Sequence, residues 1–132
     1  MSAAEMNPDN PASAEFQRNA KNNRAKIETL AKEAGVKSDI HFFAVPPMSE
    51  LMRLGDVYPA DGRYNGELRT FAAQGEFEPV SFQLFSMKDK KDVTFTVSDL
   101  KSKSGNVIPS DCLDLRTVKI WYQNGNRWTS YF

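Results

Sequence analysis

The stretch Trp121-Tyr122-Gln123-Asn124-Gly125-Asn126-Arg127-Trp128 is the part of the chain that decides its fold class. An Asn-Gly pair between alternating residues is the strongest short-range signal for a β-hairpin, because both central residues of a type I′ turn need positive φ. A two-residue turn makes the flanking residues face each other in the pairs Gln123 with Asn126, Tyr122 with Arg127 and Trp121 with Trp128. The stretch therefore predicts a β-rich domain with an aromatic hairpin.

Length and charge narrow the classes of protein to consider. The 132 residues suit one domain, and 17 basic residues balance 17 acidic ones. A chain without net charge has no field that would attract nucleic acid or an anionic membrane, so both are disfavoured as partners. No apolar run is long enough to span a bilayer. Cys112 is the only cysteine, which excludes an internal disulfide and a thiol zinc site, and we expect neither a cofactor nor a metal.

The first 40 residues differ from the rest. Met1 to Pro11 contains two Asn-Pro pairs among small residues and is expected to be a disordered tail. It lacks the pattern of a signal peptide, so the chain is either cytoplasmic or, if a leader was removed, secreted or periplasmic. From Ala12 to Ala34, apolar residues at helical spacing predict an amphipathic helix with Ser13 as N-cap and Gly35 as C′ residue.

Residues 41–132 carry alternating patterns and turn signals that are typical of β-strands. The expected strands are His41–Val45 (closed by Pro46-Pro47), Glu67–Ala73, Phe77–Met87, Asp92–Leu100, Leu113–Gln123 and Arg127–Phe132. Short polar turns between them predict an antiparallel β-sandwich, Ig-like or jelly-roll-like, with a helix before it. Because the last residues are apolar and whole sandwiches commonly have seven strands or more, we expect this module to be truncated at its C-terminal end.

Few residues suggest catalysis. Glu76 and Glu78 lie two apart in an expected strand and could form an acid and base pair, but carboxylates at a strand start are more often solvated. His41, the only histidine, is expected to be a strand residue with one satisfied nitrogen rather than a catalytic base. Cys112 has no basic neighbour to activate it and is expected to be a small buried side chain. Asp114 is expected to be a strand-start carboxylate.

The aromatic hairpin is the candidate functional site, and its residues are Trp121, Tyr122, Trp128 and Tyr131. If Val118 and Ile120 face the core, the two tryptophans face outward. Such a pair can stack on a sugar ring or lie against another domain. A bulge that turns the pair inward, into local core packing, remains the third reading.

A longer pattern links several of these segments. It consists of the run Ala73 to Phe82, then Ser98-Asp99-Leu100, then Gly105 to Pro109, then Asp114 to Trp121. This pattern resembles the N-terminal β-sandwich region of bacterial glycoside-hydrolase-like proteins, relatives of the β-N-acetylgalactosaminidases that are largely uncharacterised. The resemblance covers about Phe43 to Phe132.

The resemblance implies a non-catalytic module that precedes a barrel-like catalytic domain in one polypeptide. The catalytic carboxylates of that family lie in the barrel, so no catalytic residue is transferred to this chain. The implied partner is the C-terminal catalytic domain of the same protein. Two alternatives are a carbohydrate-binding module with a Trp121 and Trp128 platform, and a small hydrolase that uses Glu76, Glu78 or Asp114.

Overall fold

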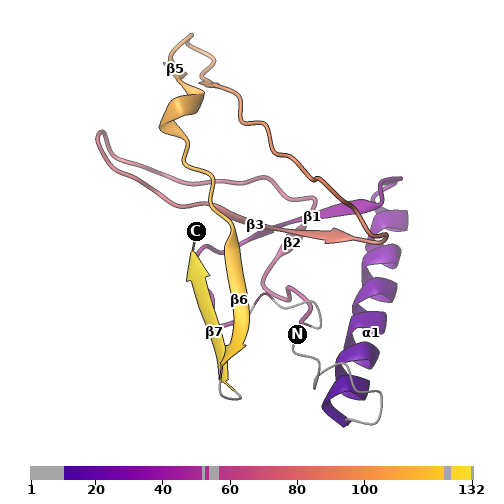
Figure 1. Ribbon diagram of the computed structural model, residues 1–132. Coiled ribbons are helices and arrows are strands. Elements are labelled where there is room, and N and C mark those ends of the chain that lie inside the picture. Colours follow the sequence, from indigo (N-terminus) through magenta and orange to yellow (C-terminus); the bar gives the residue numbers. More distant parts are fainter. Residues whose placement is uncertain (1–10, 52, 54–56, 124–125, 132) are drawn as a thin grey trace. The chain divides into compact units, whose positions relative to one another are not determined.

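The computed structural model describes residues 11–51, 53, 57–123 and 126–131. The chain divides into two compact units, residues 1–89 and 90–132. The first unit contains the helix α1 and a three-stranded sheet, and the second contains two hairpins (Figure 1). The fold is therefore a helix combined with small antiparallel sheets, a mixed arrangement of α and β structure in which the expected antiparallel pairing is present.

Helix α1 (Pro11–Glu33) confirms the predicted helix to within a residue at each end. It ends as the sequence indicates, because Gly35 adopts φ 67° and its N–H donates to Lys32 O at 3.2 Å, while Val36 N donates to Ala31 O at 2.9 Å. These two bonds satisfy carbonyls that the helix end leaves free. The prediction of Ser13 as N-cap is wrong, because the helix already begins at Pro11, whose missing N–H and fixed φ suit the first helical turn.

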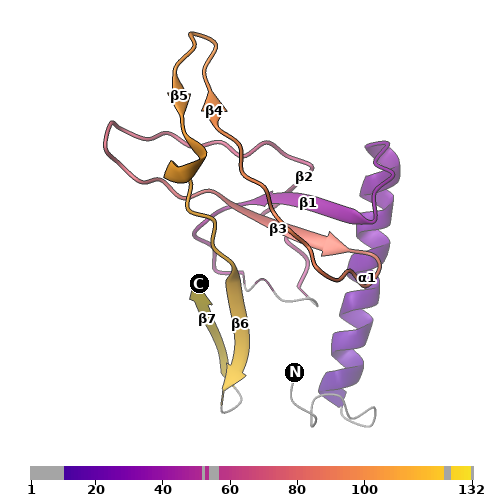
Figure 2. The same cartoon turned by 45° about the horizontal axis from the view of Figure 1, so that its top comes forward.

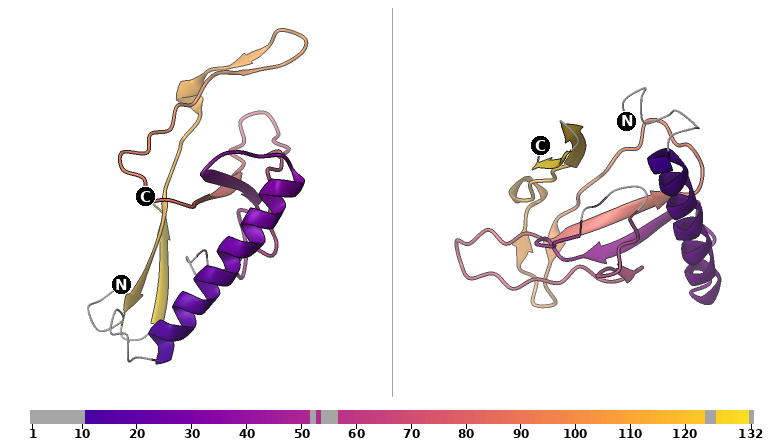
Figure 3. Two further views of the ribbon diagram at one scale, coloured as in Figure 1. Left: turned by 90° about the vertical axis from the view of Figure 1, so that its right-hand side faces the viewer. Right: turned by 90° about the horizontal axis from the view of Figure 1, so that it is seen from below.

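The sheet of the first unit has the order β2-β1-β3, with β1 (Ile40–Val45) in the middle. Strand β3 (Ser81–Ser86) pairs antiparallel with the whole of β1, and β2 (Arg63–Tyr64) pairs only with its last part. Strand β1 confirms the predicted strand before Pro46-Pro47, and the prolines end it because they cannot donate to a ladder. Two further views show α1 running across the strands (Figures 2 and 3).

The core of the first unit lies between α1 and this sheet. Ile27 from the helix packs with Phe43 and Val45 from β1. The Phe43 ring makes edge contacts with Tyr58, Tyr64 and Phe85, at centroid distances of 5.9, 5.3 and 5.9 Å. Alternate residues of β1 point to opposite faces, so Phe42 lies on the other face and stacks on Phe82 at 5.4 Å. A single aromatic side chain thus ties the helix, all three strands and the segment before β2 together.

Residues 67–80 connect β2 to β3 and form an extended two-armed segment beside the sheet (Figure 1). Its turn is where the sequence predicts it, with Gly75 at φ 81° and Glu76 N donating to Ala73 O. The strand predicted for Glu67–Ala73 is absent, and the one predicted for Phe77–Met87 is limited to β3. Phe71 and Phe77 on the arms are 96% and 91% exposed, so the alternating pattern here is not matched by burial.

The second unit contains the hairpins β4-β5 and β6-β7. Strands β4 (Leu100–Lys101) and β5 (Val107–Ile108) flank the predicted turn, where Gly105 has φ 90°. The 3-10 helix η1 (Ser110–Cys112) follows, and then β6 (Val118–Gln123) and β7 (Asn126–Tyr131). The strand predicted for Asp92–Leu100 is wrong except at its last residue, because residues 92–99 lie outside the strands.

Candidate functional site

The predicted aromatic hairpin is present as β6-β7. Its register pairs Gln123 with Asn126, Tyr122 with Arg127 and Trp121 with Trp128, which confirms the pairing expected from a two-residue connection. Asn124 and Gly125 lie outside the described residues. Directly opposite residues of an antiparallel pair belong to the same face, so the two tryptophan positions share one face.

The two tyrosine positions of the candidate site belong to the other face. Tyr131 is paired with Val118, so the two positions share a face. Val118 and Tyr122 are four residues apart on the same strand, and positions an even number apart share a face, so Tyr122 and Tyr131 do too. The register therefore divides the four predicted residues into a tryptophan pair and a tyrosine pair. A single flat ligand on one side of the hairpin would meet one pair and not the other.

His41 is a structural residue of the sheet. It is 3% exposed, lies on β1 and shares a hydrogen bond of 2.8 Å between Nδ1 and the Tyr64 hydroxyl. This geometry confirms the expectation of a strand histidine with one satisfied nitrogen. Burial raises the pKa of the Tyr64 hydroxyl, which keeps the phenol protonated and able to donate.

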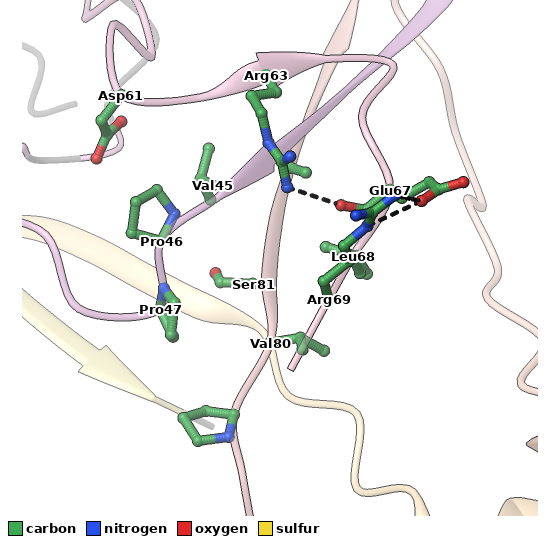
Figure 4. A pocket seen from close by; sticks show the side chains of 12 residues that line it. Val45, Pro46, Pro47, Asp61, Arg63, Glu67, Leu68, Arg69, Val80 and Ser81 are labelled. Atoms are coloured by element: carbon green, nitrogen blue, oxygen red, sulfur yellow. Dashed lines mark hydrogen bonds and ion pairs between the residues drawn. The ribbon is translucent and has the colours of Figure 1, made fainter. Parts of the chain in front are cut away.

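A hollow of about 220 Å³ opens beside the end of β1 (Figure 4). Pro46 and Pro47 form one side of it, and Arg63, Glu67 and Leu68 lie across from them. The remaining lining residues come from β1, from the loop before β2, from the segment that connects β2 to β3 and from the first residue of β3: Ala44, Val45, Asp61, Arg69, Pro79, Val80 and Ser81. The hollow thus combines apolar walls with four charged side chains.

Asp61 is held in an ion pair at the edge of this hollow. Both of its oxygens accept from Arg53, at 2.6 and 2.7 Å, and Ser49 Oγ donates to Oδ2 at 2.6 Å. The hydrogen bonds from Arg53 and Ser49 lower the pKa of Asp61 from 3.8 to about 2, against the opposing effect of partial burial. The ion pair with Arg53 and the hydrogen bond from Ser49 therefore connect the loop before β2 to the preceding segment of the chain.

Glu67 also has a cationic partner. Its carboxylate accepts from Arg69 Nε at 3.0 Å and from Nη2 at 2.5 Å, and this neighbour lowers the pKa of Glu67. Arg63 Nη2 donates to the backbone oxygen of Glu67 at 3.0 Å (Figure 4). Arg63 makes no ion pair within the part of the chain that the structure describes.

The other candidate residues are not among those that line the hollow. Glu76 accepts from Ala73 N at 2.9 Å, Glu78 is exposed, and Asp114 pairs with Arg116 at 2.6 Å. Cys112 is exposed in η1, so the prediction of a buried side chain is wrong.

The described ranges were also compared with the requirements of a metal site and of a membrane-spanning helix, and they meet neither. No group of three His, Cys, Asp or Glu side chains there is arranged to hold a metal ion, and no helix there is long and apolar enough to cross a bilayer. Comparison of the chain with protein-family models, with curated proteins and with solved structures gives no match.

The sequence does not reveal the hollow. Pro46, Arg63 and Leu68 lie in three separate segments, and only the β2-β1-β3 pairing brings them together. The nearest local signal is the pair of turns at Asp61-Gly62 and Asn65-Gly66, which place Arg63 on a short strand between them.

Proposed function

We propose that this chain is a non-catalytic β-sandwich module, the N-terminal region of a larger glycoside-hydrolase-like protein, which docks against the catalytic domain. The glycoside-hydrolase part of the proposal rests on the sequence resemblance over about Phe43 to Phe132. The docking part rests on the exposed apolar side chains of the second unit.

The observation that carries docking is the exposure of apolar residues between positions 93 and 118. Val93 and Val97 are 49% and 37% exposed, and Leu100 and Ile108, paired on β4 and β5, are 51% and 52% exposed. None of residues 90–118, the part of this unit whose burial is described, is buried. Apolar side chains gathered on a surface are typical of a contact face, because covering them removes apolar area from water.

The exposure of these apolar residues also supports a β-sandwich as the fold of the docked module. Residues 92–98 alternate between apolar and polar side chains, the pattern of a strand that is buried on one face. We propose that docking covers this face and that the segment then becomes a strand of the sandwich. Residues 67–73 are the second segment of this kind, since their predicted strand is likewise not formed.

The test uses this chain and, as a separate protein, the polypeptide that follows Phe132 in the reading frame. We expect the two to associate, and we expect the double variant Val93→Asp/Val97→Asp to weaken association about tenfold or more. The matched control is Thr94→Asp/Thr96→Asp, which adds the same charges to the other face. Titration calorimetry measures both, and circular dichroism checks that both variants keep the helix.

Two results would contradict the proposal. If the two double variants weaken association equally, the alternating face is not the contact surface. If the reading frame encodes no catalytic domain, or the separate domain does not bind, the docking role is wrong.

The register of β6-β7 favours one second candidate function, carbohydrate binding. Trp121 and Trp128 are paired in the ladder, and two tryptophans at paired positions on one face of a hairpin suit stacking on a sugar ring. Titration of glycans against tryptophan fluorescence tests this candidate. A saturable change that Trp121→Ala removes supports it, and a fluorescence that no glycan alters eliminates it.

A further inference from the structure

The hollow beside β1 contains one cationic side chain, Arg63, that forms no ion pair with a carboxylate of the described residues. Of its four charged side chains, Asp61 is neutralised by Arg53 and Glu67 by Arg69. Arg63 forms no such pair: its Nη2 donates to the neutral backbone oxygen of Glu67, and its charge adds only a minor attraction to the Glu67 carboxylate. That bond uses one of the five N–H groups of a guanidinium. The other donors are available to a ligand.

Apolar side chains form part of the walls of the hollow, beside its charged groups. Pro46 and Pro47 present rigid rings on one side, and Leu68 and Val80 contribute aliphatic side chains on the other (Figure 4). Ser81 adds one hydroxyl group, a donor and acceptor, at the start of β3. A hollow of this kind selects ligands by the shape of their apolar part and by the charge of the group that meets Arg63.

We propose that this hollow binds a small organic monocarboxylate, in which one carboxylate is attached to an apolar ring or a short apolar chain. Arg63 would hold the carboxylate, since a guanidinium matches its two oxygens with parallel N–H groups. The apolar body of the ligand would lie against Pro46 and Pro47. The volume of about 220 Å³ suits a single ring rather than an oligosaccharide.

The position of Arg63 is fixed by the fold, which favours a built site over an incidental surface cation. Arg63 lies on β2 directly opposite Ala44 of β1. The next turn packs closely on its base, because a Cβ added at Gly66 would lie 2.8 Å from Arg63 Cβ. Glu67 O then holds the guanidinium, so the carboxylate would meet a donor that is already oriented.

The experiment is an NMR titration of the ¹⁵N-labelled full chain with benzoate, and separately with its neutral isostere benzamide. We expect saturable shifts at the amides of Arg63, Leu68 and Ser81 with benzoate, at a Kd of roughly 1 mM, and no saturation with benzamide. The Arg63→Met variant removes the charge and keeps the aliphatic stem. It should bind benzoate about tenfold more weakly or not measurably.

Two further variants complete the design. Arg63→Lys keeps the charge without the planar fork and should bind with intermediate strength. Arg18→Met, on the exposed side of α1, removes an arginine elsewhere and should bind as the unaltered chain does. The amide spectrum of each variant reports whether the β1 ladder is retained.

Three results would overturn the proposal: saturation by benzamide equal to that by benzoate, unaltered benzoate binding by Arg63→Met, or shifts that follow every basic residue of the surface. The last result would mean general electrostatic association only. None of these outcomes depends on the test of the docking proposal, which measures variants of Val93 and Val97 in the second unit.

Discussion

Replacement of Phe43 is the sharpest test of the packing described for the first unit. Its ring is 1% exposed and meets Tyr58, Tyr64 and Phe85 edge-on, while Ile27 of α1 covers the same cluster. Phe43→Ala should lower the free energy of unfolding by about 3–5 kcal/mol, the range for buried aromatic truncations. The core of this unit is small, so such a loss is a large fraction of its stability.

A milder variant separates ring contacts from lost volume. Phe43→Leu keeps most of the buried apolar volume but loses three ring contacts, which at about 0.5–1.5 kcal/mol each amount to about 1.5–4.5 kcal/mol. The matched control is Phe77→Ala, which removes the same atoms as Phe43→Ala does, but from a side chain that is 91% exposed. It should change the free energy of unfolding by less than about 0.5 kcal/mol.

Urea denaturation, followed by the helical circular dichroism signal, measures all three variants. Helix α1 is the only α-helix of the described residues and packs on the Phe43 cluster, so its signal reports this unit. The reasoning is refuted if Phe77→Ala costs as much as Phe43→Ala. It is also refuted if α1 keeps its full signal and stability when Phe43 is alanine.

Three more predictions concern polar groups and one glycine. The pKa of Asp61 is about 2 instead of 3.8, so its ion pair should stabilise the first unit above about pH 4, and this contribution should be lost as the pH falls toward 2. The variant Asp61→Asn should lack this acid-dependent loss of stability in an acid titration. At neutral pH its free energy of unfolding should be lower by about 1 kcal/mol or less, because the pair is partly solvated. Tyr64→Phe should lower the urea midpoint by the equivalent of about 1–3 kcal/mol, since it leaves Nδ1 of the 3%-exposed His41 without its partner, and no change would mean that the bond is dispensable. Gly35→Ala should lower the melting temperature, with a loss of about 1–2 kcal/mol in the free energy of unfolding, because the φ of 67° is unfavourable for a residue with a Cβ. The added Cβ meets nothing within 4 Å, so the loss comes from the backbone conformation alone, and Gly35→Asn should lose less because asparagine tolerates this conformation better.

The sequence predicted the elements whose signals are local. Helix α1, strand β1 before two prolines and the hairpin β6-β7 all depend on residues close in the chain, and each was placed correctly. The period-two segments 67–73 and 92–98 were not, because an alternating pattern states which face would be buried and not whether a partner strand covers it.

The same distinction holds for the candidate site. Sequence spacing fixed the register that brings Trp121 opposite Trp128, because a two-residue turn leaves no other pairing. It did not indicate that Arg63 would form no ion pair, since that depends on which of the nearby acidic side chains pair with other arginines. That choice is made by contacts between segments distant in the chain.

The sequence by itself therefore determined the positions of the helix, of the strand before the two prolines and of the turns at Gly75 and Gly105, and which residues face each other across the last hairpin. Only the tertiary structure decided that Phe43 rather than Phe77 is the centre of the core, and that a hollow opens at the end of β1. The physical reason is that turns, caps and prolines act through the backbone within a few residues. Burial and charge balance are properties of neighbours that only folding brings together.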